Sequence, residues 1–517
     1  MVGKLSKLGL HGNFLEIIKS IYESTTNSII YGDKLTKTFK SNIGVKQGDT
    51  LSTTLFNLYL NDLPNEFIFD GNDSVKIGQS DISCLLYADD LIIMATSPEA
   101  LQKCVTKLEQ YCTKWKLEVN LKKTKVMIFN KQGSLIKKHK FYYKNSMIEN
   151  VREYKYLGFL FTCSGSDQTG IANLLKQAKK AWFAIRYYLK KSENKHINTY
   201  LHIFESQVRP IILYACEAWA DTLKDDRSLL ENIQRNSIEK FHISVLKQIL
   251  GVHKKTSNIA VLVETGIHPL SLTSKMQAIK YFLRLPSIDE NKLLHAYHES
   301  QKTEKLGTFT KFITNSLDKI GMSSIWRDQL IENKDNSDDK KLVKSIKQRL
   351  EDISSQTITS ELAGSSKLTF LASIKHEHKF EPYLNIHNFE HRRALTKLRT
   401  SSHKLEIEVG RWNDVQKEDR ICKNCLLNKI EDEFHLLFDC HMHIRDRSKL
   451  FETLEQKINI NTKDKMNQAD TLSKIFASDD LSSLNAIGKF IKNSLQKREN
   501  MTLYTLPPHY VLYHTEG

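Results

Sequence analysis

Two aspartates stand side by side in an otherwise apolar stretch, CLLYADDLIIMA, at residues 84–95. The apolar residues predict two short strands with Asp89 and Asp90 at the hairpin tip between them. Adjacent carboxylates repel each other unless a cation neutralises them, and Mg²⁺ takes such oxygen ligands while keeping waters and substrate phosphates. The pair therefore predicts a site for two-metal phosphoryl transfer. An ordinary aspartate-rich turn is the alternative.

A second group of residues suited to chemistry lies in the segment CKNCLLNKIEDEFHLLFDC. Its candidate ligands are Cys422, Cys425, His435 and Cys440. Three thiolates and an imidazole suit tetrahedral Zn²⁺, and a two-residue gap lets both thiolates of one turn reach the same ion. The run FHLLFDC places the histidine and the last cysteine at the two ends of a short helix. His441 or His443 is the alternative fourth ligand, and a metal-free turn with a core histidine is the alternative to zinc.

The bulk properties favour a polyanionic partner. The chain has 517 residues, enough for about three domains, and 40% hydrophobic residues, enough for buried cores. Its formal net charge of +16 favours nucleic acid first and an anionic membrane surface second.

The cellular compartment can also be inferred from composition. No apolar run reaches 18 residues, and the N-terminal residues lack the unbroken apolar region of a signal peptide. We therefore expect an intracellular protein, in the nucleus or the cytoplasm, with no membrane partner. Three of the eight cysteines cluster, which indicates metal rather than disulfides in a reducing compartment.

Hydrophobic periodicity predicts the elements that must position these residues. We expect helix 51–63 with Asp49 or Thr50 as its N-cap, helix 99–117, and strands at 125–130 and 154–162. From about 168 to 250 the pattern is helical and ends at Gly251. Residues 255–400 also look helical. Within them a polar linker leads into an amphipathic helix marked by Leu342, Ile346, Leu350 and Ile353.

Four ordered motifs resemble one protein family. The segment GVKQGDTLSTTLF resembles the Gly-x-x-Gln-Gly-x-x-Leu-Ser segment of reverse transcriptases, and LLYADDLII resembles their Tyr-x-Asp-Asp hairpin. WKLEVNLKKTKVMIF resembles the following Asn-x-x-Lys-Thr segment, and VREYKYLGFLF the Tyr-Leu-Gly primer-contacting hairpin. Their order and the later pieces LYACEAW and VETGIHPL are most similar to the LINE-type, non-LTR retrotransposon branch. The resemblance covers most of the chain.

The resemblance implies roles for the residues of the hairpin tip. Asp89 is then the principal Mg²⁺ ligand, and Asp90 adds charge and shapes the metal site. Tyr87 packs near the primer end.

Three further residues acquire implied roles in binding nucleotide and template. Gln47 and Gly48 lie close to the template and the incoming nucleotide, although a helix-entry turn explains the same residues. Lys123 supplies a cation or a proton near the departing pyrophosphate, unless it is one surface lysine among several.

The family also needs a further catalytic aspartate, which usually precedes the equivalent of LSKLGLHGNFLEIIKSIY. The only aspartate before residue 49 is Asp33, in YGDKL, and it lacks that segment's surroundings. Thr53 stands where the family usually has proline, a mild departure. We therefore expect a C-terminal fragment without the endonuclease, the fingers and the first catalytic aspartate. Its catalysis would be impaired, because that aspartate normally bridges both metals.

A basic segment precedes the Cys/His group, as in LINE-type C-termini. We expect Arg392, Arg393, Lys397 and Arg399, with His403, to form a basic surface that contacts RNA or target DNA. A solvated helix face is the alternative for each single residue.

The expected fold is α+β. Its predicted parts are a partial polymerase palm at 1–163, a helical thumb and connection at 164–300, a helical region with a linker at 301–400, a zinc-knuckle-like module at 401–450 and a helical tail at 451–517. The expected partners are an RNA template, a DNA target or primer and, if the chain is active, dNTPs. A catalytically dead nucleic-acid-binding remnant is the alternative function, and a subunit completed by another chain is a third.

Overall fold

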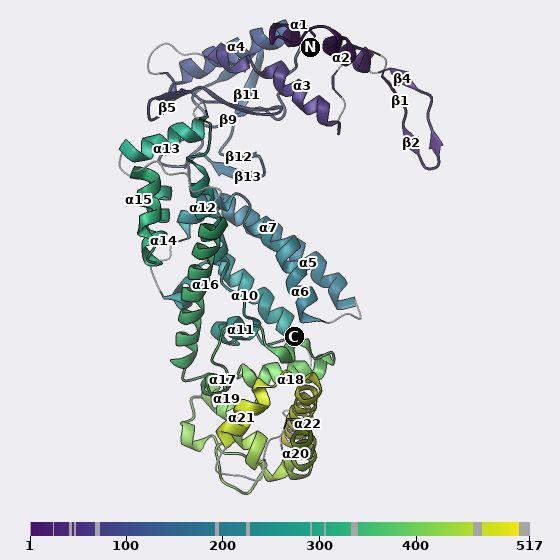
Figure 1. Ribbon diagram of the computed structural model, residues 1–517, viewed down its shortest axis with the longest axis vertical. Helices are drawn as coiled ribbons and strands as arrows, with labels where there is room; N and C mark the ends of the chain where they lie inside the picture. Colours follow the sequence, from purple (N-terminus) through teal and green to yellow (C-terminus); the bar gives the residue numbers. More distant parts are fainter. Residues whose placement is uncertain are drawn as a thin grey trace. The chain divides into compact units, whose positions relative to one another are not determined.

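The computed structural model is rich in helix (Figure 1) and describes residues 2–23, 25–40, 44–45, 48–67, 73–191, 196–223, 228–289, 292–303, 307–331, 340–458 and 468–505. The chain divides into two compact units. The first contains Met1–Lys155, Phe161–Ser166 and Ile288–Glu304, and the second contains Tyr156–Leu160, Asp167–Ser287 and Lys305–Gly517. The expected α+β class is confirmed, with the strands in the N-terminal third of the sequence.

The first unit mixes short helices and strands. Its elements are α1 (Val2–Lys7), α2 (Asn13–Glu23), β1 (Thr26–Asn27), β2 (Ile30–Tyr31), β3 (Lys34–Leu35), β4 (Phe39–Lys40), α3 (Thr50–Leu60), the 3₁₀ helix η1 (Leu63–Phe67), β5 (Val75–Ile77), β6 (Ser80–Ile82), β7 (Cys84–Tyr87), β8 (Asp90–Ile93), α4 (Pro98–Trp115), β9 (Lys125–Val126), β10 (Phe141–Tyr143), β11 (Ser146–Asn150) and α13 (Leu293–Thr303). The hairpin of β12 (Glu153–Tyr156) and β13 (Phe159–Thr162) carries residues of both units.

The strands of the first unit form separate small sheets. Hairpins pair β5 with β6 and β7 with β8, and β11 lies between β10 and β9 in a three-stranded sheet. The strand expected at 125–130 is only the two residues of β9. Within the described residues no ladder joins these pieces into one continuous sheet, so a partial palm stays a prediction.

Helix α3 starts and packs as its sequence indicates. Asp49 is the N-cap, and its carboxylate accepts hydrogen bonds from Leu51 N–H and from the hydroxyl of Ser52. Leu55 is buried, and Leu51 and Leu58 pack beside it. This confirms Asp49 as the cap. The helix itself ends at Leu60, three residues earlier than expected, and η1 follows.

A buried lysine joins the first helix to α3 and α4. The Nζ atom of Lys4 lies 2.6 Å from Asp62 Oδ1 and 2.6 Å from the hydroxyl of Tyr111. It also lies 3.9 Å from the ring centroid of Trp115 and 4.7 Å from that of Tyr59. These aromatic rings belong to or pack against the cluster that lies under β7 and β8, so the lysine is tied to the core of the aspartate hairpin.

The second unit is helical. Its elements are α5 (Gln168–Lys191), α6 (Ile197–Ile203), the π-helical turn η2 (Phe204–Val208), α7 (Arg209–Ile212), α8 (Cys216–Trp219), η3 (Ala220–Thr222), α9 (Leu229–Arg235), α10 (Ser237–Leu250), α11 (Asn258–Thr265), α12 (Leu270–Arg284), α14 (Thr308–Lys319), α15 (Ser323–Ile331), α16 (Lys340–Ala363), α17 (Thr369–Ile374), η4 (Pro382–Asn385), α18 (Phe389–Arg399), α19 (Glu406–Trp412), η5 (Lys417–Asp419), η6 (His435–Asp439), η7 (His441–His443), α20 (Ile444–Ile458), α21 (Gln468–Ala477) and α22 (Leu481–Thr505).

One large apolar core runs through the second unit. It includes the inner face of α5, almost all of α11, and side chains of α10, α18 and α22. Helix α18 packs along α22, which in turn packs against α20 (Figure 1). Gly251 ends α10 in the left-handed conformation, with φ of 69°, as expected from its position after the last apolar residue.

Helix α16 confirms most of the expected amphipathic pattern. Ile346 and Leu350 are buried and Leu342 is half-buried, but Ile353 is 37% exposed. The apolar stripe continues instead through Ile358 and Leu362. The polar linker expected before this helix lies at residues 332–339, outside the described part of the chain.

The two compact units test only some of the domain boundaries that the sequence predicts. The first unit corresponds mainly to residues 1–163 and also takes in α13. The later boundaries at 300, 400 and 450 all fall within or beside the second unit and stay predictions. Among the helices that the structure describes, none combines the length and the apolar character needed to cross a membrane.

Candidate functional site

The aspartate pair lies at the tip of the β7–β8 hairpin. Tyr87 pairs with Asp90, so Ala88 and Asp89 form a two-residue loop. Ala88 has a φ of 51°, a left-handed conformation that costs an L-residue about 1–2 kcal/mol. Strained residues of this kind concentrate at functional sites, because the surrounding structure must hold them in place. The expected hairpin is confirmed, but its two-residue loop is Ala88–Asp89, one residue earlier than the expected Asp89–Asp90 tip, and Asp90 begins β8.

The inner face of the hairpin packs on helices. Cys84, Leu86, Leu91 and Ile93 contact the core cluster formed by α4, η1 and the end of α3. Because side chains alternate along a strand, Tyr87 and Asp90 stand on the opposite, outer face. The apolar residues around the pair thus anchor the hairpin, while the tip stays in solvent.

Both carboxylates are free to take a cation. Asp89 and Asp90 are exposed, and no ion pair within the described residues reaches either of them. Their adjacent negative charges and oxygen donors fit Mg²⁺, which prefers such ligands and accepts open positions for water and phosphate. Two neighbouring aspartates, however, supply few oxygen ligands, and they cannot surround two metal ions on their own.

No third carboxylate joins the pair among the described residues. Asp49 is committed to the N-terminus of α3. Asp33 lies in the loop of another hairpin, between Tyr31 and Lys34. That loop resembles the β7–β8 loop, because Gly32 has a φ of 58° and is followed by an exposed aspartate. It therefore offers a matched control for an aspartate at a two-residue hairpin tip.

The other residues expected near nucleotide and template have separate local roles. Gly48 is exposed with a φ of 91°, a conformation that glycine adopts readily. Lys123 is exposed and lies in a turn in which Asn120 Oδ1 accepts the Lys123 N–H at 3.3 Å. Gln47 lies outside the described residues. Among the described residues no hydrogen bond or ion pair joins Gly48 or Lys123 to the aspartates, and their binding roles stay predictions.

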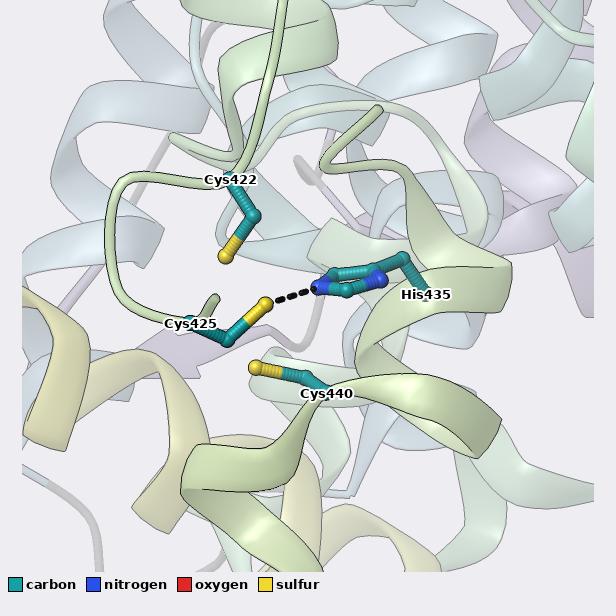
Figure 2. A group of neighbouring side chains, drawn as sticks. All are labelled: Cys422, Cys425, His435 and Cys440. Atoms are coloured by element: carbon teal, nitrogen blue, oxygen red, sulfur yellow. Dashed lines mark hydrogen bonds between the residues drawn. The ribbon is translucent and has the colours of Figure 1, made fainter. Parts of the chain in front are cut away.

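The expected zinc ligands come together in the second unit (Figure 2). One ligand atom from each of Cys422, Cys425, His435 and Cys440 lies within 4.8 Å of the others. His435 points its Nε2 atom toward Cys425 Sγ at 3.4 Å. Tetrahedral bonds of about 2.3 Å place ligand atoms about 3.8 Å apart, so the four donors fit a zinc ion. The structure assembles this set with neither His441 nor His443 in it.

A short hairpin presents the two thiolates that are close in sequence. Ile421 and Ile430 form an antiparallel bridge, and Cys422 N–H donates to the Lys429 carbonyl at 2.9 Å. Asn428 takes the left-handed conformation with φ of 52° and turns the chain back. The residues between the thiolates thus form a tight turn, as the two-residue gap predicts.

A π-helical turn presents the other two ligands. Cys440 N–H donates to the His435 carbonyl at 2.8 Å, so the two residues lie at the ends of η6. Asp432 begins this segment, because its Oδ1 accepts the His435 N–H at 2.8 Å. The expectation of a short helix with one ligand at each end is confirmed. Turns of this wide type occur frequently at functional sites.

Charged residues around the ligands tie the module to distant helices. Arg498 of α22 donates to Glu431 at 2.7 Å and to Glu406 at 2.9 Å, and Cys422 Sγ lies 3.6 Å from Glu431. Arg447 of α20 donates to the Cys440 carbonyl at 2.7 Å. Sequence reasoning missed both arginines, since neither carries a motif. Such outer contacts orient ligands and tune the metal.

The basic segment before the module does not form the expected surface. Arg399 is 1% exposed and donates to Glu264 and Glu381, and Arg392 is 3% exposed and donates to the Ile386 carbonyl. His403 is buried against Glu433. The idea of a continuous basic surface is corrected here, because three of its five members are satisfied inside the core.

Two members of that segment remain accessible. Arg393 and Lys397 are half-buried, and Arg393 donates to the Gly251 carbonyl at 3.0 Å. Burial and then the neighbouring charge of Arg393 lower the pKa of Lys397. Both cations therefore lie close enough to interact, and their contact with nucleic acid stays a prediction.

Comparison with known proteins agrees with the sequence motifs of the first unit. A family model described as reverse transcriptase (RNA-dependent DNA polymerase) matches residues 3–161. The RNA-directed DNA polymerase from mobile element jockey of Drosophila funebris is 21% identical over 45% of this chain and 25% of its own length. The Pol polyprotein from the type-1 retrotransposable element R2 of Popillia japonica is 24% identical over 53% of this chain and 37% of its own length.

A further relative supports the same branch. The Pol polyprotein from the type-2 retrotransposable element R2DM of Drosophila melanogaster is 28% identical over 31% of this chain and 16% of its own length. The chain thus matches between about a sixth and two fifths of these three relatives. Residues 3–161 therefore carry a reverse transcriptase domain, and the chain is similar to proteins of non-LTR retrotransposons.

Proposed function

We propose that the chain takes part in RNA-templated DNA synthesis, with Asp89 and Asp90 as its catalytic carboxylates. The observation that carries this proposal is the exposed aspartate pair at the tip of a hairpin with a strained loop, which no ion pair within the described residues reaches. Mg²⁺ bound there would activate the primer hydroxyl and stabilise the leaving oxygen of the incoming dNTP. The partners are then an RNA template and a DNA primer or nicked target.

The chain's own residues would position rather than transform the substrates. Asp89 and Asp90 hold the cation at the hairpin tip, and the core under β7 and β8 fixes that tip. Tyr87, on the outer face beside Asp90, would pack against the primer end. Gly48 would let a nucleotide approach the backbone closely, and Lys123 would neutralise charge on the departing pyrophosphate.

We expect the isolated chain to be a weak polymerase. Two-metal transfer needs ligands that clamp both ions, and the described residues bring no third carboxylate to Asp89 and Asp90. The metals would therefore be held loosely and the in-line geometry would be poorly defined. A second chain that supplies the further carboxylate is one way to complete the site.

Primer extension on an RNA template tests the catalytic proposal. The purified full chain is incubated with an annealed DNA primer, dNTPs and Mg²⁺, alone and with a longer relative added. We expect slow extension that Asp89→Ala abolishes and that Asp33→Ala, the aspartate of the matched hairpin, leaves unchanged. Robust extension by the lone chain would contradict the impairment, and extension that survives Asp89→Ala would contradict the catalytic role.

A nucleic-acid-binding protein without catalysis is the second candidate. The net charge of +16 and the two-carboxylate site favour it. Neutralisation of phosphates releases counterions, so its affinity for nucleic acid would fall steeply as salt rises. Salt-dependent binding without any extension, even when a longer relative is present, would select this function.

We propose further that Zn²⁺ occupies the Cys/His group. Three of the four donors are buried and Cys425 is half-buried, and His435 Nε2 lies 3.4 Å from Cys425 Sγ, which supports a closed structural site. The ion would hold the hairpin of residues 421–430 against η6. Elemental analysis of the purified chain should find about one zinc per molecule, and none would contradict the proposal.

A further inference from the structure

The outer face of α5 is aromatic and basic, and the core does not use it. Its inner face buries Leu174, Ala178 and Trp182. On the outer face Phe183 is 73% exposed, Tyr187 55% and Tyr188 71%. Exposed apolar side chains that gather in one place, rather than stand singly, mark interaction surfaces.

Four lysines lie along the same side of the helix as Phe183 and Tyr187, and Tyr188 is offset around the helix with its ring centroid 5.6 Å from that of Tyr187. Lys176, Lys179, Lys180 and Lys191 are exposed, and residues spaced by three or four lie next to one another on a helix. Lys191 Nζ lies 4.5 Å from the ring centroid of Tyr187. We call this set, together with Phe183, Tyr187 and Tyr188, the α5 face.

The charge of α5 is one-sided. Its 24 residues, QTGIANLLKQAKKAWFAIRYYLKK, include six lysines or arginines and no aspartate or glutamate. A helix that docked on an ordinary protein surface would gain from mixed charges. An exposed face with only positive charge complements a polyanion.

The neighbouring helix α10 extends this positive surface. Trp182 Nε1 and the guanidinium of Arg186 both donate to Gln248 Oε1, at 3.1 and 2.9 Å. Gln248 also lines a pocket whose wall includes Lys240, Lys247 and Lys254. Arg186, on α5 beside the α5 face, thus reaches through this glutamine a pocket lined by three more lysines.

We propose that the α5 face binds single-stranded RNA, with bases stacked on Phe183, Tyr187 and Tyr188 and phosphates paired with the lysines. Unpaired bases offer π-faces to aromatic side chains, whereas the bases of a duplex are already stacked on each other. The tyrosine hydroxyls can also hydrogen bond the ribose 2′-hydroxyl, which DNA lacks. The choice of RNA rests on the proposed function, in which RNA is the template.

Fluorescence anisotropy with a labelled 12-nucleotide unstructured RNA tests this. The full chain is used without Mg²⁺ and dNTPs, so failure of catalysis cannot affect the result. The combined change Phe183→Ala, Tyr187→Ala and Tyr188→Ala should weaken binding at least about 30-fold with little change in salt dependence. Tyr187→Phe alone should retain most of the affinity, because the ring remains.

The lysines should give a different signature. Lys176→Gln, Lys179→Gln and Lys180→Gln together should lower the slope of log affinity against log salt by about 2, since each single-strand phosphate contact contributes about 0.7. Trp412→Ala, which removes an exposed aromatic of the same unit, is the matched control and should bind normally. Circular dichroism confirms that each variant is folded.

Three outcomes would overturn the proposal. The first is RNA affinity of the triple alanine variant within twofold of the unchanged chain. The second is a preference for single-stranded DNA or duplex over the single-stranded RNA. The third is unchanged RNA binding together with reduced self-association of the triple variant in sedimentation, which would identify a second copy of the chain as the occupant.

Discussion

The Cys/His group and the aspartate pair are built in opposite ways. His435, Cys422 and Cys440 are buried, and arginines from α20 and α22 hold the surrounding carbonyl and carboxylate groups. Asp89, in a two-residue loop, and Asp90, at the start of β8, are exposed with no such support among the described residues. The difference teaches that a metal used for folding is enclosed, whereas a metal used for chemistry needs open positions for substrate. Loss of each site should accordingly have a very different effect on stability.

The largest effect on stability is expected at the Cys/His group. Cys440→Ser should reduce zinc content from about one per chain to near zero and lower the free energy of unfolding by about 5 kcal/mol or more, because metal binding is part of the folding energy of such modules. Elemental analysis and denaturant unfolding measure this. Cys163→Ser, at a buried thiol outside the group, is the control. A Cys440→Ser variant that keeps its zinc and its stability would contradict the structural role of the Cys/His group.

The next effect is expected at Arg399, in the segment before the module. Arg399→Met should cost about 3–5 kcal/mol of unfolding free energy, because it removes the buried ion-pair partner of Glu264 and leaves Glu381 with Lys375 alone. Arg393→Met, at a half-buried position, should cost about 1 kcal/mol. Denaturant titration separates the two. Equal losses of unfolding free energy would mean that the buried ion pairs of Arg399 stabilise the chain no more than the contacts of Arg393.

An intermediate effect is expected from pH. Burial, and then the charge of neighbouring His268, lower the pKa of His378 to about 4. Between pH 6.5 and 4 the unfolded chain binds a proton that the folded chain does not, so stability falls as pH falls through this window. The loss should be on the order of 2 kcal/mol.

The measurement for His378 is unfolding free energy against pH. His378→Gln should reduce the slope between pH 6.5 and 4, and His376→Gln, at an exposed position close in sequence, should not. An unchanged slope in the first variant would show that His378 titrates normally in the folded chain.

The smallest effect on stability is expected at the aspartate pair. Asp89→Asn should change the unfolding free energy by less than about 0.5 kcal/mol, and in the stabilising direction, because it removes repulsion between adjacent carboxylates. Asp49→Ala should by contrast cost about 1 kcal/mol, since it removes the N-cap of α3. Thermal unfolding compares the two variants. A strongly destabilised Asp89→Asn would mean that the hairpin tip is structural.

The local features of both sites could be predicted because their causes lie within a few residues. The Tyr87–Asp90 hairpin, the Asp49 cap, the end of α10 at Gly251 and the Cys/His set all follow from neighbouring residue types. The burial of Arg399 could not be predicted, because its partner Glu264 is 135 residues away in sequence. Side-chain chemistry alone cannot tell a guanidinium that pairs with a distant carboxylate from one that faces phosphate.

The same reasoning explains the other departures. The strand expected at 125–130 shrinks to Lys125–Val126, because strand length depends on the partner that pairs with it. Ile353 of α16 fits the helical period but stays exposed. The period predicts which face of the helix is apolar, but it does not predict how much of that face other elements bury. The contacts of Lys4 with Asp62 and Tyr111 likewise span 58 and 107 residues.

The bond between Arg498 and Glu431 has a consequence for biosynthesis. The two residues are 67 positions apart, and a ribosome adds about 5–20 residues per second. The last of the four candidate metal ligands, Cys440, is therefore synthesised about 3–12 s before Arg498. During that interval the thiolates lack the outer contacts that Arg498 supplies, so the proposed zinc ion would be held less firmly than in the finished chain.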